Sequence, residues 1–361
     1  MKMRKIVCSF MISVVCFMTA ISGVSATSYD TSKINAAYSK VVEYYKNNNN
    51  LNNADKILAV ESLGLEAESN QFDTSSADLS STSLSKKIVT EVLLGVDPTE
   101  DKKTLESQID ENGNVEGSWG ASSDIWTLYA LYATSSEKTN LLADKLNTDL
   151  ASSSVCGYEW GGVYYADYDT TGWVIEGLAV VNKEKYATTI NKAIDYIKNN
   201  TTMTTTGWVT ADNVDTQSQV LEGMFAYDTN ALLNDSYTVH PVDCLLNTQL
   251  SDGSFPSGYN AEYTTAEVAK TLGTYKNGSV IIKAKKAYDK MMNPEQPDNT
   301  KPAQPTDTKK DSQSTNKVET TNQKTTSVKT GDETNVVIFV SLSMVSGGLF
   351  LVLRKEYERV H

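Results

Sequence analysis

The sequence predicts an all-α fold, and three observations lead to that prediction. Four similar segments recur at a nearly constant interval, apolar residues between them follow helical spacing, and the segments carry few strand-forming residues. The segments begin at Ser122, Asp169, Asp215 and Tyr263, which are 47, 46 and 48 residues apart. Such a period indicates an array of like structural units.

Each unit contains the same three parts in the same order. The first is an amphipathic run, such as residues 186–200 or 240–250, and the last is a segment that opens on Asp, Ser or Thr, as helices commonly do. Between them lies a Gly-rich turn with one aromatic residue, Trp119, Trp160, Trp208 or Phe255. We interpret each unit as two helices joined by this turn, with the recurring aromatic residue packed between units.

The N-terminal part continues the helical pattern less regularly. Residues 32–48, 53–69 and 83–98 each place apolar residues at helical spacing. We therefore expect about ten to twelve helices in pairs, in which each helix buries one face against its neighbours.

A short motif adds a resemblance to a known fold. Residues 249–255, "QLSDGSF", follow the pattern Gln, short spacer, Gly, any residue, aromatic. Together with the helix pairs and the period, this motif resembles the α/α toroid of the terpenoid cyclase and protein prenyltransferase superfamily. The resemblance covers roughly residues 53–288 and implies one toroid of about five to six helix pairs within residues 27–292, with the four stacked segments as inner helices.

The two ends of the chain predict export and anchoring. Residues 1–26 have the basic start, apolar run and small-residue cleavage site of a signal peptide. Residues 336–353 are uncharged and just long enough to span a bilayer as a helix, and the basic tail 354–361 predicts a cytoplasmic end. We expect the folded part outside the cell, on a Gram-positive-type surface.

Residues 293–335 predict a disordered stalk between the folded part and the anchor. The stalk contains four of the seven prolines and is otherwise rich in Thr, Lys and other polar residues. It ends in residues 327–331, "SVKTG", where Thr330 and Gly331 resemble the cleavage point of a cell-wall sorting signal, although Ser327 and Val328 replace the usual Leu and Pro. This resemblance implies a sortase and peptidoglycan as partners; the alternative is a permanent membrane anchor.

Composition restricts the classes of partner. The formal net charge is −13, and the folded part has no Lys/Arg-rich cluster, so we expect no nucleic-acid binding. Removal of the signal peptide leaves only Cys156 and Cys244, and the sequence does not decide whether they pair.

Asp169 is the strongest candidate catalytic residue that the resemblance implies. In "DYDT" it stands at the acid position of the Asp-any-Asp-Asp motif of class II terpene cyclases, but Thr170 replaces the final Asp. Because Asp215 occupies the same register one repeat later, we favour the interpretation that both residues cap helices. The alternative is an enzyme that protonates an isoprenoid with Asp169 as general acid.

Two further chemistries have weaker support. The run "HPVDC" brings His240, Asp243 and Cys244 together, but its spacing differs from the zinc ligands of the prenyltransferases, so we expect no metal and no cofactor. Cys156 begins "CGYEW", which resembles the start of a complement-type thioester motif, but Glu159 stands where the motif has Gln. A thioester-type adhesin is therefore a lesser alternative.

The leading prediction is a noncatalytic binding module for a glycan, a small molecule or a protein. Two rows of equivalent positions in the repeats are expected to line a central cavity or its mouth, and nearby loops add tyrosines. The first row is Trp126, Trp173, Gln219 and Glu267; the second is Tyr129, Glu176, Glu222 and Lys270; the loop residues include Tyr164, Tyr165 and Tyr168.

Overall fold

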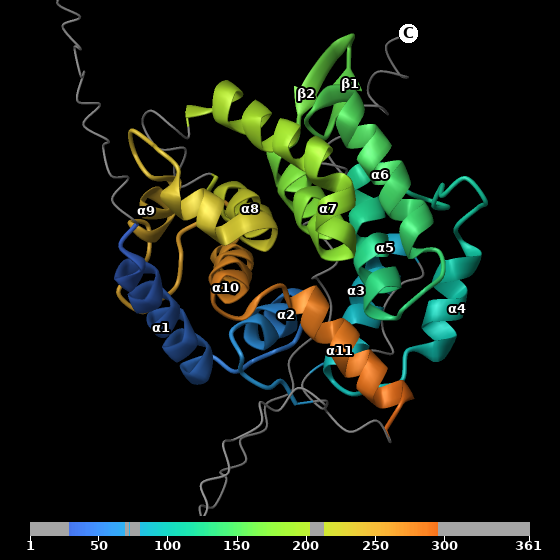
Figure 1. The fold of residues 1–361 in the computed structure, drawn as a ribbon. Coiled ribbons are helices and arrows are strands. Elements are labelled where there is room, and N and C mark those ends of the chain that lie inside the picture. Colours follow the sequence, from blue (N-terminus) through green and yellow to red (C-terminus); the bar gives the residue numbers. More distant parts are fainter. Residues whose placement is uncertain (1–28, 69–71, 73–79, 203–212, 295–361) are drawn as a thin grey trace, which may run out of the picture. The chain divides into compact units, whose positions relative to one another are not determined.

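The computed structural model describes residues 29–68, 72, 80–202 and 213–294 (Figure 1). These residues form eleven helices and one small hairpin, so the predicted all-α class is confirmed. In chain order the helices are α1 (Thr31–Asn47), α2 (Ala54–Ser62), α3 (Ser81–Leu93), α4 (Thr99–Ser107), α5 (Ala121–Ala133), α6 (Thr139–Ser153), α7 (Tyr168–Asn200), α8 (Val214–Asn234), α9 (Pro241–Leu246), α10 (Ala261–Asn277) and α11 (Val280–Met292).

Two long helices each contain a bend. Asn182 in α7 and Asp228 in α8 have non-helical backbone angles, and the side chain of each accepts a hydrogen bond from the backbone N–H three residues later. This is the hydrogen bond of a helix N-cap, so a new helical segment starts at each bend. Each of these long helices therefore supplies two consecutive helical segments of the repeat.

Short polar side chains start several of the other helices. Asp30, Asn53, Asn260 and Ser279 each accept a hydrogen bond from a backbone N–H in the first turn of α1, α2, α10 or α11. The predicted boundaries of α1 are close to the observed ones, and α2 and α3 begin close to the predicted positions but end earlier than predicted, at Ser62 and Leu93.

Six helices contact one another in a closed order. α2 packs against α3, α3 against α5, α5 against α7, α7 against α8, α8 against α10, and α10 against α2. We call α2, α3, α5, the first half of α7, the first half of α8 and α10 the central ring. Figure 1 shows α10 lying between α8 and α2 in this arrangement.

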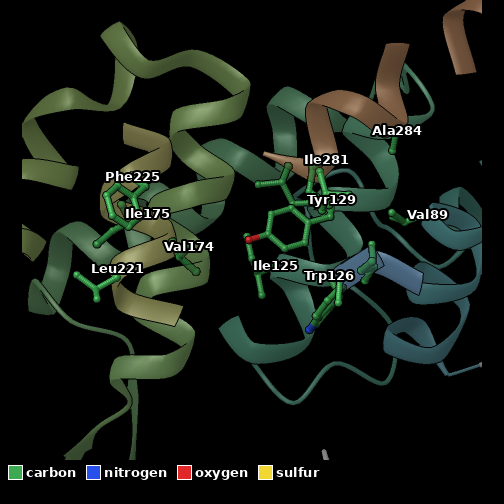
Figure 2. Close-up of a cluster of buried hydrophobic side chains, with 14 of the residues drawn as sticks. Val89, Ile125, Trp126, Tyr129, Val174, Ile175, Leu221, Phe225, Ile281 and Ala284 are labelled. Carbon is green, nitrogen blue, oxygen red and sulfur yellow. The ribbon is translucent and has the colours of Figure 1, made fainter. Parts of the chain in front are cut away.

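The remaining helices pack on this ring. α1 and α9 contact each other and lie against α10 and α8, respectively, while α4 contacts α3 and α5, and α6 contacts α5 and α7. α11 packs against α2, α3, α5 and α10. Figure 2 shows part of the buried core, with Ile125, Trp126 and Tyr129 of α5, Val174 and Ile175 of α7, Leu221 and Phe225 of α8, and Ile281 and Ala284 of α11.

Two glycines allow α7 and α8 to approach closely. A Cβ atom on Gly172 would lie 2.4 Å from the carbonyl oxygen of Gln219, and one on Gly223 would lie 2.3 Å from the carbonyl oxygen of Gly172. Both distances are shorter than van der Waals contact, so this crossing requires glycine at both positions.

One element differs from the prediction. The turn before α7 contains an antiparallel hairpin of β1 (Gly157–Trp160) and β2 (Val163–Ala166), where only a Gly-rich turn was expected. The two linking residues, Gly161 and Gly162, both have positive φ, as a tight two-residue hairpin turn requires. A Gly-Gly pair between aromatic residues was the signal for it in the sequence.

The predicted signal peptide, stalk, sorting motif and transmembrane helix lie outside the described residues. Within the described ranges, no helix is both long and apolar enough to cross a bilayer.

Candidate functional site

Both rows of repeated positions meet at the centre of the ring. Seven of the eight side chains are buried, and Trp173 is half-buried. Equivalent positions contact each other between neighbouring repeats: the Trp126 and Trp173 rings are 5.7 Å apart, and Gln219 is bonded to Glu267. The predicted residues are therefore brought together, but they contact one another and fill the centre instead of lining an open cavity.

The second row supplies a tyrosine and two glutamates. The Tyr129 hydroxyl donates to Glu176 Oε2 at 2.8 Å and also to the backbone oxygen of Trp173 at 2.9 Å. The Thr274 hydroxyl donates to Glu222 Oε1 at 3.3 Å. Burial raises the pKa of both glutamates, and for Glu222 the adjacent Glu176 carboxylate raises it further.

Lys270 places one ammonium group among these carboxylates. Its Nζ lies 2.9 Å from Glu267 Oε1, and both side chains are buried. Burial alone would lower the pKa of Lys270, but Glu267 and Glu222 outweigh this effect and raise it above its usual value. The centre of the ring therefore holds three carboxyl groups, from Glu176, Glu222 and Glu267, and one stable positive charge.

The first row surrounds the same lysine with aromatic rings and an amide. Lys270 Nζ is 5.5 Å from the centre of the Trp126 ring and 5.9 Å from that of Trp173, within the range of cation–π attraction. Gln219 Nε2 donates to Glu267 Oε2 at 3.1 Å and to the Tyr263 hydroxyl at 3.2 Å.

The N-terminal ring helices add a pair that the sequence analysis missed. Lys86 of α3 lies 3.0 Å from Asp55 Oδ1 of α2, and its ammonium is 4.4 Å from the Trp126 ring centre. Burial would raise the pKa of Asp55, but Lys86 and Lys270 together lower it. These helices do not share the 47-residue register, so the alignment of repeats could not find the pair.

Several polar atoms in this cluster have no hydrogen-bond partner among the described residues. They are Trp173 Nε1, Glu176 Oε1, Gln219 Oε1, Glu222 Oε2 and Glu267 Oε1, although the last contacts the Lys270 ammonium. Leaving such buried groups unpaired costs stability, so native proteins keep few of them. Apart from the Trp173 N–H, which is a donor, all of these atoms are acceptors, so the site has unused capacity to bind positive charge or hydrogen-bond donors.

Asp169 does not cap its helix, and the capping interpretation was wrong. The N-cap of α7 is Asp167, whose side chain accepts from the Thr170 N–H at 3.0 Å. Asp169 lies in the first turn of α7. Burial and the nearby Asp167 raise its pKa to about 7, although a hydrogen bond with Thr216 lowers the pKa in part.

Asp215 likewise lies in the first turn of its helix, two residues after the N-cap. The N-cap residue of α8 is Asn213, and the Asp215 carboxylate accepts a hydrogen bond from the Tyr259 hydroxyl. The repeated acid therefore sits two residues after the helix start in both α7 and α8, because the first turn of each helix begins earlier than the repeat alignment suggested.

The loop tyrosines lie away from the central cluster. Tyr164 and Tyr165 are on β2 and are 47% and 44% exposed, while Tyr168 is the first residue of α7 and is half-buried. The ring of Tyr165 stacks on that of Tyr158 of β1, with centroids 5.5 Å apart.

The Gly-turn aromatics do not share one role. Phe255 is fully buried, as expected for a packing residue, but Trp119 is 66% exposed, and for it the packing interpretation was wrong. The Trp160 side chain and Trp208 lie outside the described part of the structure.

The candidate metal residues have other partners. His240 Nδ1 accepts from the Val242 N–H at the start of α9, and Asp243 Oδ1 accepts from Tyr29 at 2.7 Å and from Lys33 at 3.0 Å. No cluster of the described His, Cys, Asp and Glu residues, including Cys244, has an arrangement that fits a metal ion.

Cys156 is a buried thiol that is not bonded to Cys244. Burial raises its pKa to about 12, and its backbone N–H donates to the Thr171 hydroxyl. A thiol with so high a pKa is a poor nucleophile at neutral pH, which disfavours thioester chemistry at this position.

Comparison with known proteins adds no relationship: no protein-family model, curated protein or solved structure matches the chain.

Proposed function

We propose that this chain is a noncatalytic binding module of the α/α toroid type, displayed on a cell surface, and that its ligand is a glycan. The closed order of contacts among the six ring helices supports the toroid. The exposed aromatic residues that gather in the loops before the ring helices carry the functional part of the proposal.

These aromatic residues lie at one end of the ring. Equivalent positions of α5 and α7 contact each other, as do those of α8 and α10, so within each pair the helices run in the same direction. Close approaches of Gly172 to Gln219, and of Ile175 to Gly223 further along both helices, extend this direction from α7 to α8. The loops that precede these helices are therefore on the same end.

We call this surface the aromatic end: Trp119, Tyr158, Tyr164, Tyr165 and Tyr259, which are between 44% and 66% exposed. Flat aromatic rings accept the apolar faces of sugar rings, and nearby carboxylates accept hydrogen bonds from sugar hydroxyls. Asp167, which is partly exposed at the start of α7, supplies such a carboxylate. An exposed cluster of large aromatic residues also carries a solvation cost that binding would relieve.

The test is a glycan screen of the purified protein with tryptophan fluorescence and calorimetry as readouts. The double variant Tyr158→Ser/Tyr165→Ser removes the stacked pair, and we expect at least a tenfold loss of affinity for the bound glycan. Tyr132→Ser, which changes a partly exposed tyrosine at the far end of α5, is the matched control. Failure of every glycan to bind the native protein, or unchanged binding by the double variant, rejects the glycan proposal.

An enzyme acting on an isoprenoid is the second candidate, because the raised pKa of Asp169 keeps a fraction of this carboxyl protonated near neutral pH. Two hollows of about 290 Å³ occur in the described part of the chain, and Asp169 lines neither. Incubation with linear isoprenoids and product analysis test this candidate; turnover that Asp169→Asn abolishes in a folded protein would favour the enzyme over the binding module.

The proposed location rests on the sequence of the two ends. Export by residues 1–26 and retention by the expected membrane span 336–353 would place the folded part outside the cell, and a sortase would cut the Thr330–Gly331 bond and join Thr330 to peptidoglycan. In the native host, release of the protein by a muramidase from wild-type cells but not from a Thr330→Ala strain distinguishes wall linkage from a permanent membrane anchor.

A further inference from the structure

A hollow at the opposite end of the ring from the aromatic end lies next to the central carboxylates. Its volume is about 290 Å³, and it is lined by α7 just before its bend, by α8 around its bend, by the last turn of α10 and by the start of α11. Two of its lining residues, Ala179 and Tyr275, are partly exposed, so solvent and small solutes can reach it.

The floor of the hollow is polar and connects to two buried glutamates. Its lining includes Thr274 and Ser279. The Thr274 hydroxyl donates to Glu222, and the Ser279 side chain interacts with the carboxylate of Glu176. Each lining hydroxyl therefore joins the hollow to one carboxylate.

Both glutamates keep an unused acceptor. Glu222 Oε2 and Glu176 Oε1 have no hydrogen-bond donor among the described residues, although their side chains are 1% and 2% exposed. Lys270 supplies one positive charge to three carboxyl groups, and the pKa values of Glu176 and Glu222 stay raised because this charge does not compensate for their burial and mutual repulsion, so a second cation here would stabilise their ionised forms.

The walls of the hollow are apolar and aromatic. Phe225 and Tyr275 lie with ring centres 5.3 Å apart, and Val180 and Ile282 are also part of the lining. Such walls favour the hydrocarbon part of a ligand. The volume of the hollow is at the small end of the range for small-molecule sites. The carboxylates do not form a cluster that fits a metal ion.

From this combination we propose a second binding site that takes a small organic amine in its ammonium form. The ammonium group donates hydrogen bonds to the Thr274 and Ser279 hydroxyls and balances the charge of Glu222 and Glu176. The hydrocarbon part lies against Phe225 and Tyr275. This site is separate from the proposed glycan surface, so each proposal can fail without the other.

Calorimetry with 2-phenylethylamine tests the charge requirement. The neutral isostere 2-phenylethanol has the same ring and chain, so we expect the amine to bind at least tenfold more tightly. Equal affinity for the two probes, or no heat from the amine at millimolar concentration, would overturn the proposal.

Three variants of the full chain test the location. Glu222→Gln preserves the side-chain shape and is expected to weaken amine binding at least tenfold, whereas Glu184→Gln, at an exposed position of α7, should leave it unchanged. Ala226→Phe fills the hollow without changing a carboxylate and should also abolish binding, which provides an answer if Glu222→Gln fails to fold. Native affinity in a folded Ala226→Phe variant would exclude this hollow as the site.

Discussion

At the residue scale, the centre of the ring contains more ionisable groups than a typical protein core. Glu176, Glu222, Glu267 and Lys270 are all buried, although charged side chains seldom are. Their pairing limits the cost of burial, but the unpaired oxygen atoms leave part of that cost uncompensated. Stability alone therefore does not explain the residues at these four positions.

Asp169 should make the stability of the protein depend on pH. Its pKa is raised to about 7 in the folded protein, whereas the unfolded carboxyl titrates near its ordinary value of 3.8. Between these values the folded state binds the extra proton, so the stabilisation is complete below about pH 4 and is lost as the pH rises toward 7.

The free energy of unfolding of the native protein should therefore fall between pH 5 and pH 8. In Asp169→Asn we expect this fall to be smaller by roughly 1–3 kcal/mol. A smaller decline should remain, because the pKa values of Glu91, Glu176 and Glu222 are also raised. Urea unfolding at the two pH values measures this effect, with the exposed Asp195→Asn on α7 as control. An identical pH dependence in both variants would contradict the assignment.

At the element scale, the repeat places small residues where helices cross. Gly172 of α7 and Gly223 of α8 lie at the closest approach between two ring helices, and a Cβ on either would meet backbone atoms, which cannot move aside. Gly177, also in α7, differs because a Cβ there would meet the end of the flexible Ile125 side chain at 2.5 Å.

Gly172→Ala should therefore destabilise the protein by about 1–3 kcal/mol through overpacking, despite the better helix propensity of alanine. Gly177→Ala is the matched control in the same helix, and we expect a clearly smaller loss, because Ile125 can change its rotamer and alanine favours the helix. Thermal unfolding of the two variants measures the difference. A larger loss for Gly177→Ala would show that the crossing at Gly172 is not rigid.

At the scale of the whole folded part, the closed order of ring contacts joins the first described helices to the last ones. α2 packs against α10, Gln249 donates to the backbone of Ala37, and Lys283 forms an ion pair with Glu61 at 2.6 Å. In an open array of repeats each unit supports only its neighbours, whereas a closed ring gives every ring helix two neighbours.

We therefore expect residues 29–294 to unfold in one transition. Circular dichroism follows all helices, and tryptophan fluorescence includes the signals of Trp126 and Trp173 at the centre, so the urea midpoints of the two measurements should coincide. Separate midpoints would indicate that the ring opens before its centre unfolds.

The sequence by itself determined the helical class, the repeat and the two rows of side chains that meet at the centre. These features follow from local periodicity, because an apolar or polar residue that recurs at helical spacing occupies the same face of every unit. The same periodicity led to the wrong prediction that Asp169 and Asp215 are N-caps. A helix can begin one or two residues earlier without any change in the repeat.

Only the tertiary structure decided what those side chains do together. In the folded protein, Lys270 and its carboxylate partners fill the centre, and Asp55 and Lys86 lie beside them on helices outside the register. Trp119 is exposed, whereas Phe255 is buried. The physical reason is that burial and charge pairing depend on contacts between residues distant in the chain, and such contacts arise only when the helices close on one another.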